Sequence, residues 1–185
     1  MIIAITGHMG VGKTTVANIF KERGFIIIDV DTLGHELLND STISERLRGM
    51  FGIQILGRDL KVDRKKLSKL VFNNPNSLKK LNEIVHPKLK LKIQEVVSKI
   101  TDNVIIDLAL YDELEADKIA DKTILVETDV SNIYERLNPQ YTKSEILTVM
   151  NNQNITSNFD YIVENNGTIQ DLNGKVEQIL GKIKL

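Results

Sequence analysis

The sequence contains no cysteine among its 185 residues. This absence excludes a disulfide-stabilised scaffold, a thiolate nucleophile and a cysteine-ligated zinc or iron–sulfur centre. Long apolar runs are also missing, since none approaches the roughly 18 residues of a membrane-spanning helix. The first residues carry no basic segment ahead of an apolar run, unlike a secretory signal peptide. We therefore expect a soluble, cytoplasmic protein with no membrane partner, either a monomer or a weak homo-oligomer.

A strong net charge is absent too. The chain has 24 lysine and arginine residues against 25 aspartate and glutamate residues, a formal net charge of −1. A general nucleic-acid binder needs clustered positive charge, so we expect no nucleic-acid partner. The balance is uneven, because residues 61–100 hold eleven basic and three acidic residues, a net +8, and the remainder carries −9. Either this stretch forms helices with solvated faces, or it is a lobe that receives an anionic ligand larger than a simple nucleotide.

Short apolar runs alternate with helical patterns along the chain. The runs are rich in isoleucine and valine and lack period-two alternation, which is typical of strands buried on both faces of a parallel sheet. Apolar positions at helical spacing in residues 13–23, followed by Gly24, predict a helix and its end. Together these patterns predict a single α/β domain with a doubly wound sheet, in which the mostly helical residues 32–103 form an inserted lobe. The five predicted strands are Ile2–Thr6, Phe25–Asp29, Val104–Leu108, Thr123–Glu127 and Tyr161–Val163.

The first predicted strand runs into a glycine-rich motif, Gly7-His-Met-Gly10-Val-Gly12-Lys13-Thr14, which is a full match to G-x-x-x-x-G-K-[ST]. In such a loop the glycines let successive main-chain N–H groups turn towards phosphate oxygens, and the following helix adds the positive end of its dipole. Lys13 would reach the β- and γ-phosphates, and the Thr14 hydroxyl would hold Mg²⁺. The motif predicts a nucleoside-triphosphate site.

A dinucleotide-binding site is the alternative, because Asp29 ends the second predicted strand where such folds place an acid for the ribose. That site requires G-x-G-x-x-G or alanine, whereas Thr15 stands at the last position here, and the turn contains a lysine. A hydride-transfer function is therefore disfavoured. An Asn/Thr-Lys-x-Asp base-specificity motif is absent as well, which favours a metabolic kinase over a regulatory GTPase.

Asp29 and Asp31 are spaced i, i+2 in a segment that the pattern predicts to be extended. Both carboxylates would then leave the same side of the strand's carboxyl end and face the phosphate loop, where ligands of open α/β sheets bind. An acid there would orient the attacking hydroxyl or help to hold Mg²⁺. Alternatively, one of the two caps a helix that begins near Thr32. Val104–Asp107 is similar to the magnesium-supporting strand of P-loop proteins, although any buried strand can end in an acid.

Besides the phosphate loop, the chain contains the motifs Asp29-Val-Asp31, Asp63-Arg64-x-x-Leu67, His86-Pro87, Ile106–Glu113, Arg136-Leu137, Gln153 and Asp160–Gly167. Through these motifs the chain resembles, from end to end, the dephospho-CoA kinase family. That family transfers the γ-phosphoryl group of Mg·ATP to the ribose 3′-hydroxyl of dephospho-CoA, the last step of coenzyme A synthesis. The resemblance implies a P-loop kinase-like three-layer fold with a five-stranded parallel sheet. It further implies a core of about 1–35 and 101–185, a helical CoA-binding lobe of about 36–100 and a short lid of about 131–153.

The resemblance also assigns roles to residues at matching positions. Asp31 would be the catalytic base with Asp29 in support, while Lys13 and Arg136 would act on the transferring phosphoryl group. His86 is either a structural residue at a helix start or a substrate contact, and Asn165, like Asn166, either approaches the adenine or forms a turn. The implied cofactors are ATP and Mg²⁺, and the implied partner is the small-molecule substrate dephospho-CoA. In full, ATP binding falls on Gly7, Gly10, Val11, Gly12, Lys13, Thr14, Thr15 and Asn165, substrate binding on Asp29, Asp31, His35, Arg64 and His86, and Mg²⁺ binding on Thr14 and Asp31.

Two places depart from the family's pattern. His35 stands where the family usually has an arginine, so a pH-dependent charge replaces a permanent one. The lid retains Arg136 as its only arginine, with Gln140 where the family has a second. Either Arg136 and Lys143 suffice for the transferring phosphoryl group, or the basic lobe lends a residue, or the enzyme is slow or altered in its acceptor. A kinase of another nucleoside or nucleotide, and a P-loop binding protein with weakened catalysis, therefore stay open.

Overall fold

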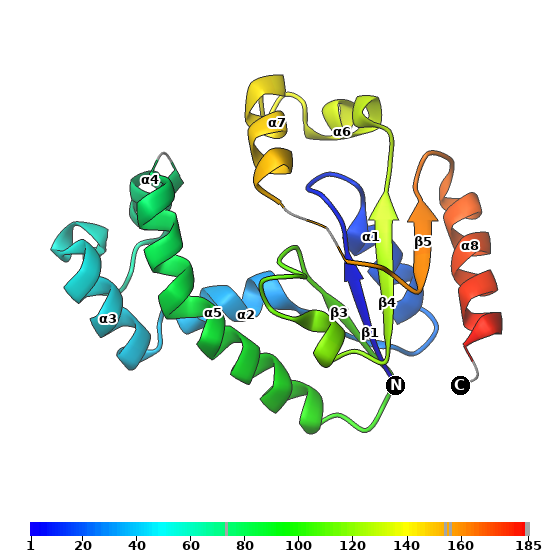
Figure 1. The fold of residues 1–185 in the computed structure, drawn as a ribbon, viewed down its shortest axis with the longest axis horizontal. Helices are drawn as coiled ribbons and strands as arrows, with labels where there is room; N and C mark the ends of the chain where they lie inside the picture. Colours follow the sequence, from blue (N-terminus) through cyan, green and yellow to red (C-terminus); the bar gives the residue numbers. More distant parts are fainter. Residues whose placement is uncertain (73, 154, 156, 184–185) are drawn as a thin grey trace. The chain divides into compact units, whose positions relative to one another are not determined.

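The strand that precedes the glycine-rich loop lies in the middle of a five-stranded sheet (Figure 1). In the computed structural model, which describes residues 1–72, 74–153, 155 and 157–183, every pairing in this sheet is parallel. Ile3, Ala4, Ile5 and Thr6 of the central strand are all buried, as the absence of period-two alternation predicts. In spatial order the strands are β2 (Ile26–Asp29), β3 (Val104–Asp107), β1 (Ile2–Thr6), β4 (Lys122–Glu127) and β5 (Tyr161–Glu164). The predicted α/β class with a five-stranded parallel sheet is confirmed.

Helix α1 (Lys13–Lys21) follows the loop, and the chain turns away after it at Gly24, the glycine that the sequence indicates as the helix stop. Gly24 has φ 89°, and its N–H and that of Phe25 donate to the carbonyls of Lys21 and Phe20 at 3.0 and 3.2 Å. These two bonds form a Schellman motif. The buried rings of Phe20 and Phe25 pack edge to face with centroids 5.3 Å apart, which supplies the apolar contact of that motif. Because Phe25 closes the helix, β2 begins one residue later than predicted.

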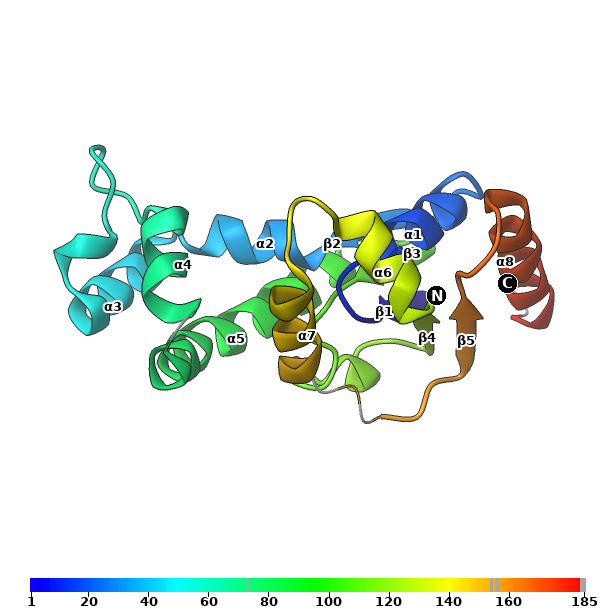
Figure 2. The ribbon, with the colours of Figure 1, turned by 90° about the horizontal axis from the view of Figure 1, so that it is seen from above.

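The chain divides into two compact units, a first unit of residues 1–29 and 97–185 and a second unit of residues 30–96. The further helices of the first unit are η2 (Ala116–Lys118), α6 (Val130–Leu137), α7 (Lys143–Asn152) and α8 (Ile169–Lys182). Helices α1 and α8 contact each other beside the sheet and share its apolar core. Figures 1 and 2 show α6 and α7 at the edge where the strands have their carboxyl ends. This edge therefore brings the glycine-rich loop and the helices α6 and α7 into one region of the first unit.

Helices make up most of the second unit, as the sequence pattern of this interval predicts. They are α2 (Val30–Leu37), α3 (Ser41–Phe51), η1 (Ile53–Ile55), α4 (Arg64–Phe72) and α5 (Pro75–Ser98), the last two residues of which belong to the first unit. This unit has an apolar core of its own, in which Ile43, Leu47 and Ile55 are fully buried. Throughout the described part of the chain, no helix combines the length and the apolar character needed to cross a membrane.

Pro87 lies inside α5, so the interpretation of His86-Pro87 as a helix start is wrong. A proline in a helix interior lacks the N–H of the helical hydrogen bond and costs about 3 kcal/mol or more. The helix nevertheless continues, because buried apolar side chains, among them Ile84, Leu89 and Ile93, hold it on both sides of the proline. Tertiary burial here outweighs a local signal for a helix boundary.

Partial burial lowers the pKa of His86 below its ordinary value of 6.5. The folded protein therefore binds this proton less readily than the unfolded chain, so the neutral ring stabilises the fold above pH 6.5. That stability is lost as the pH falls from there through the lowered pKa. We expect urea unfolding to show a steeper loss of unfolding free energy below pH 6.5 in the wild type than in His86→Gln. Two curves separated by the same offset at every pH would contradict this prediction.

Candidate active site

The glycine-rich loop between β1 and α1 depends on missing side chains at two positions. Gly12 has φ 96°, and a Cβ there would lie 2.3 Å from Nδ2 of Asn165. Gly7 has φ 150°, and a Cβ there would lie 2.3 Å from the carbonyl oxygen of Val126. Both positions therefore require glycine. Gly12 is also the N-cap of α1 and has no side chain to occupy the first N–H groups of that helix, which suits them to bind phosphate oxygens.

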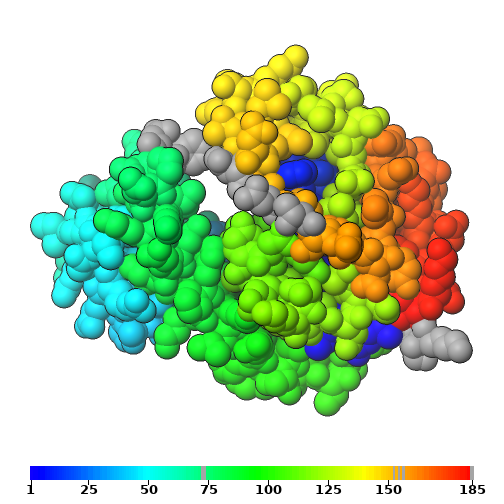
Figure 3. All heavy atoms as spheres, in the orientation of Figure 1, coloured from blue at the N-terminus to red at the C-terminus, as the bar shows by residue number. Residues whose placement is uncertain are grey.

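Lys13 is the first residue of α1, and its ammonium group reaches back to the start of the loop. Nζ donates to the carbonyl oxygens of Gly7 at 2.9 Å and His8 at 3.2 Å. The predicted phosphate-binding residues from Gly7 to Thr15 thus form one continuous segment. The Lys13 ammonium group lies against its first residues, and the first N–H groups of α1 lie at its end. Figure 3 shows the amino-terminal segment, in dark blue, at the surface beside α7. This segment combines the charge and the N–H donors that a polyphosphate needs.

Hydroxyl and carboxylate oxygens lie at the carboxyl edge of the sheet beside the loop. Oγ1 of Thr14 donates to Oδ2 of Asp107 at 3.0 Å, and Asp107 at the end of β3 is the register partner of Asp29 at the end of β2. Mg²⁺ prefers such hard oxygen donors and usually takes only one or two protein carboxylates together with water and substrate phosphates. No group of three or more metal-ligating His, Cys, Asp or Glu residues occurs in the described part of the chain. The donors at this edge therefore suit a Mg²⁺ ion that shares its coordination with a nucleotide.

Asp107 is a candidate that the predicted site residues omit. Its strand pattern resembled a magnesium-supporting strand, but any buried strand can end in an acid. Thr14 and Asp107 are 93 positions apart in the sequence, and they meet only because β3 lies next to β1 in the sheet. The strand order, which the sequence pattern does not reveal, is therefore what identifies Asp107 as a candidate among the acids that end strands.

Asp31 lies in the first turn of α2, so the expectation that Asp29 and Asp31 share one side of an extended segment is wrong. β2 ends at Asp29, and the helix begins at Val30 without an intervening loop, two residues before the predicted start. Val30, Leu33 and Leu37 recur at helical spacing, and an acid in the first turn is favoured by the helix dipole. Asp31 is exposed and belongs to the second unit, two residues along the chain from Asp29.

Arg136, near the end of α6, is held against the phosphate loop by three main-chain carbonyls. Nη1 donates to Gly10 at 3.2 Å and to Val11 at 3.0 Å, and Nη2 donates to Asn165 at 2.8 Å. Asn165 is 6% exposed, and its Nδ2 donates to the same Val11 carbonyl at 2.8 Å. The predicted lid arginine and the predicted adenine-contacting asparagine thus meet at one carbonyl of the loop.

Two further side-chain amides, Gln153 and Asn166, make contacts that no local pattern predicts. Oε1 of Gln153, at the C-cap of α7, accepts the Met9 N–H at 3.1 Å, 144 positions away. Oδ1 of Asn166 accepts the Thr128 hydroxyl and the Asp129 N–H, both at 2.8 Å. Gln153 and Asn166 stand in the motifs that resemble the kinase family. Only the folded chain shows that Gln153 connects α7 to the loop and that Asn166 connects the segment after β5 to the segment after β4.

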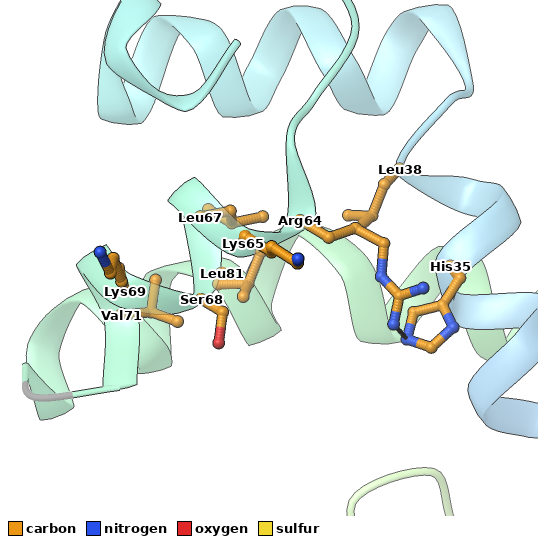
Figure 4. A pocket seen from close by; sticks show the side chains of 9 residues that line it. All are labelled: His35, Leu38, Arg64, Lys65, Leu67, Ser68, Lys69, Val71 and Leu81. Atoms are coloured by element: carbon orange, nitrogen blue, oxygen red, sulfur yellow. Dashed lines mark hydrogen bonds between the residues drawn. The ribbon is translucent and has the colours of Figure 1, made fainter. Parts of the chain in front are cut away.

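The second unit contains a pocket of about 940 Å³ lined by residues of α4, by His35 of α2, by Leu38 directly after α2, and by Leu81 of α5 (Figure 4). Nη2 of Arg64 donates to Nε2 of His35, since a guanidinium can only donate. Lys65 and Lys69 add further cations to the lining, whereas His86 is not among its residues. The apolar part of the lining consists of Leu38, Leu67, Val71 and Leu81. Of the predicted substrate residues in this unit, the structure therefore brings His35 and Arg64 together in the pocket and leaves His86 outside it.

A family model described as dephospho-CoA kinase matches residues 1–171. The dephospho-CoA kinase of Fusobacterium nucleatum is 36% identical over 185 residues, an alignment that covers 96% of each chain. Among solved structures, a Thermus thermophilus protein with 26% identity has a TM-score of 0.82 and aligns with 100% of this chain and 98% of its own. The dephospho-CoA kinase of Campylobacter jejuni, with 22% identity, a TM-score of 0.69 and coverage of 98% and 96%, has the same fold.

Proposed function

This chain belongs to the dephospho-CoA kinase family, and we propose that its phosphate loop and the pocket of its second unit bind the two substrates of that reaction. The chain has dephospho-CoA kinase activity and uses ATP as phosphoryl donor. The bond from the γ-phosphorus to the ADP oxygen breaks, a bond to the ribose 3′-oxygen forms, and the proton of that hydroxyl passes to a base. The observation that carries the proposal is the loop from Gly7 to Thr15 with Thr14 bonded to Asp107.

On the donor side, Lys13 and the main-chain amides from Gly10 to Thr15 bind the β- and γ-phosphates of ATP. Thr14 and Asp107 would hold Mg²⁺, which when bound supplies positive charge to the phosphate oxygens. Their 3.0 Å contact and their hard oxygen donors support this assignment. We therefore add Asp107 to Thr14 and Asp31, the residues to which the resemblance assigns Mg²⁺.

On the acceptor side, Asp31 orients the 3′-hydroxyl and takes its proton, and Asp29 supports it. The segment of about 36–100 serves as the CoA-binding lobe. Arg64, Lys65 and Lys69 supply cations for the diphosphate of the acceptor, and the apolar lining of the same pocket suits its pantetheine arm. The net +8 over residues 61–100 supports an anionic ligand over the alternative of merely solvated helical faces.

The segment of about 131–153 serves as the lid. Among its described residues, Arg136 near the end of α6 and Gln153 at the C-cap of α7 hydrogen-bond to the phosphate loop. Both side chains bond to main-chain atoms of the loop, so that the lid and the loop are ordered together. This coupling would link nucleotide binding to the conformation of the lid.

A coupled assay of ADP release tests the acceptor. We expect turnover with ATP to depend on dephospho-CoA and to stay at the background rate with AMP, CMP or no acceptor. Turnover with AMP or CMP but none with dephospho-CoA would make the chain a kinase of another nucleotide. Tight ATP binding without stimulation by any acceptor would favour the P-loop binding protein with weakened catalysis.

A further inference from the structure

The carbonyl oxygen of Val11 accepts two side-chain donors at once. Nη1 of Arg136 donates to it at 3.0 Å and Nδ2 of Asn165 at 2.8 Å. Both donors come from segments remote in sequence, 125 and 154 positions away. A carbonyl with two lone pairs is saturated by two such bonds. The orientation of this carbonyl is therefore set by the lid helix α6 and by the segment after β5.

The peptide bond between Val11 and Gly12 transmits that orientation to the phosphate-binding face of the loop. Asn138–Pro139 is the one cis bond in the described residues, so this peptide is trans, and its carbonyl and the Gly12 N–H point in opposite directions. Fixing the Val11 oxygen towards Arg136 and Asn165 thus aims the Gly12 N–H away from them. Gly12 has φ 96°, and a Cβ there would meet Asn165 Nδ2 at 2.3 Å, so the Gly12 backbone is packed directly against the Asn165 side chain. We call Arg136 and Asn165, which together hold the Val11 carbonyl, the brace.

We propose that Arg136 and Asn165 are positioning residues that hold the Val11–Gly12 peptide in its phosphate-binding orientation, and that Arg136 sets the affinity for the nucleotide diphosphate. This inference rests on the proposed function, because it takes the loop to be the ATP site. The guanidinium is engaged by three carbonyls, including that of Asn165 itself, so Arg136 also ties the two elements of the brace to each other. Its positive charge then acts beside the loop rather than on the transferring phosphoryl group.

Binding of ADP, which has no γ-phosphate, shows whether Arg136 positions the loop or acts on the transferring phosphoryl group. For a brace, we expect calorimetry to show that Arg136→Gln weakens ADP at least about 10-fold, since hydrogen bonds from a charged group are lost. The KM for dephospho-CoA should stay unchanged, and kcat at saturating ATP should fall less than the ADP affinity. A cation that acts only in the transition state predicts the reverse, an unchanged ADP affinity with a large loss of kcat, and that result would overturn the proposal.

The Asn165→Ala variant tests the second positioning residue independently. It should weaken ADP in the same direction, and the double variant should lose less than the product of the two single effects, because both side chains act on one carbonyl. Saturating ADP should protect the Gly12 amide from hydrogen exchange less in either variant than in the wild type. Full wild-type protection at Gly12 in a folded, ADP-saturated Arg136→Gln protein would contradict the proposal.

Lys118→Gln is the matched control, since it removes an exposed cation of the first unit that pairs with Glu115 at 2.7 Å. It should leave ADP affinity and exchange at Gly12 unchanged. The wild type also separates the two proposals. If it binds no ADP, the proposed function of the loop fails, whereas ADP binding that is insensitive to Arg136 removes only the brace.

Discussion

Replacing Asp31 with asparagine should lower turnover with dephospho-CoA at least about 100-fold while leaving ATP affinity unchanged. The amide keeps the shape of the side chain and can still accept a hydrogen bond from the 3′-hydroxyl, but it cannot take up the proton. ATP affinity should be preserved because Asp31 lies on α2, outside the phosphate loop. Single-turnover kinetics with saturating ATP and dephospho-CoA, together with calorimetry of ATP binding, measure the two effects separately.

Asp102→Asn is the control for Asp31→Asn. Asp102 is an exposed acid before β3, and its substitution changes the net charge by the same amount without touching α2. Its turnover should equal that of the wild type. If Asp31→Asn turned over at the wild-type rate, Asp31 would have no part in proton transfer and the base would have to be sought elsewhere. A parallel loss of ATP affinity would instead assign Asp31 to the donor site.

The Lys13→Met variant should lose about 1000-fold in kcat/KM for ATP, because a cation placed at the β- and γ-phosphates acts on charge that develops during transfer. Methionine matches the length and apolar character of the lysine stem but cannot donate to phosphate oxygens. It also abolishes the bonds from Nζ to Gly7 and His8, which hold the side chain across the start of the loop. Initial rates over a range of ATP concentrations, at saturating dephospho-CoA, measure the loss.

Lys21→Met is the matched control, because Lys21 is an exposed lysine in the last turn of the same helix. Its kcat/KM should remain at the wild-type value, and its unfolding midpoint should be compared with that of Lys13→Met to verify that both proteins are folded. A loss of less than about 10-fold in Lys13→Met would show that main-chain amides alone provide most of the phosphate binding.

Parts of the structure whose interactions are local could be predicted from the sequence. The phosphate loop is one, because its glycines, Lys13 and Thr14 lie within eight consecutive positions and carry all of the groups that the motif requires. The end of α1 at Gly24 is another, since the Schellman bonds join residues at most five positions apart. The central strands were also predictable, because burial on both faces leaves a continuous apolar run.

Predictions failed where a local signal competed with tertiary burial. Asp31 was expected in an extended segment, but the apolar positions Val30, Leu33 and Leu37 favour a helix that begins directly after β2. Pro87 was expected to mark a helix start, but the helix α5 runs through it because apolar side chains on both sides are buried. In both cases the propensity of one or two residues was weaker than the packing of the whole element.

The sequence by itself determined that this chain binds a nucleoside triphosphate without cysteine chemistry, and that its near-neutral charge conceals a basic stretch over residues 61–100. Those conclusions follow from residue types and short spacings. The tertiary structure alone decided that Thr14 meets Asp107, that Arg136 and Asn165 share the Val11 carbonyl, and that His35 meets Arg64. These pairs are 29 to 154 positions apart, so strand order and helix packing, which no local pattern encodes, determine which side chains come together.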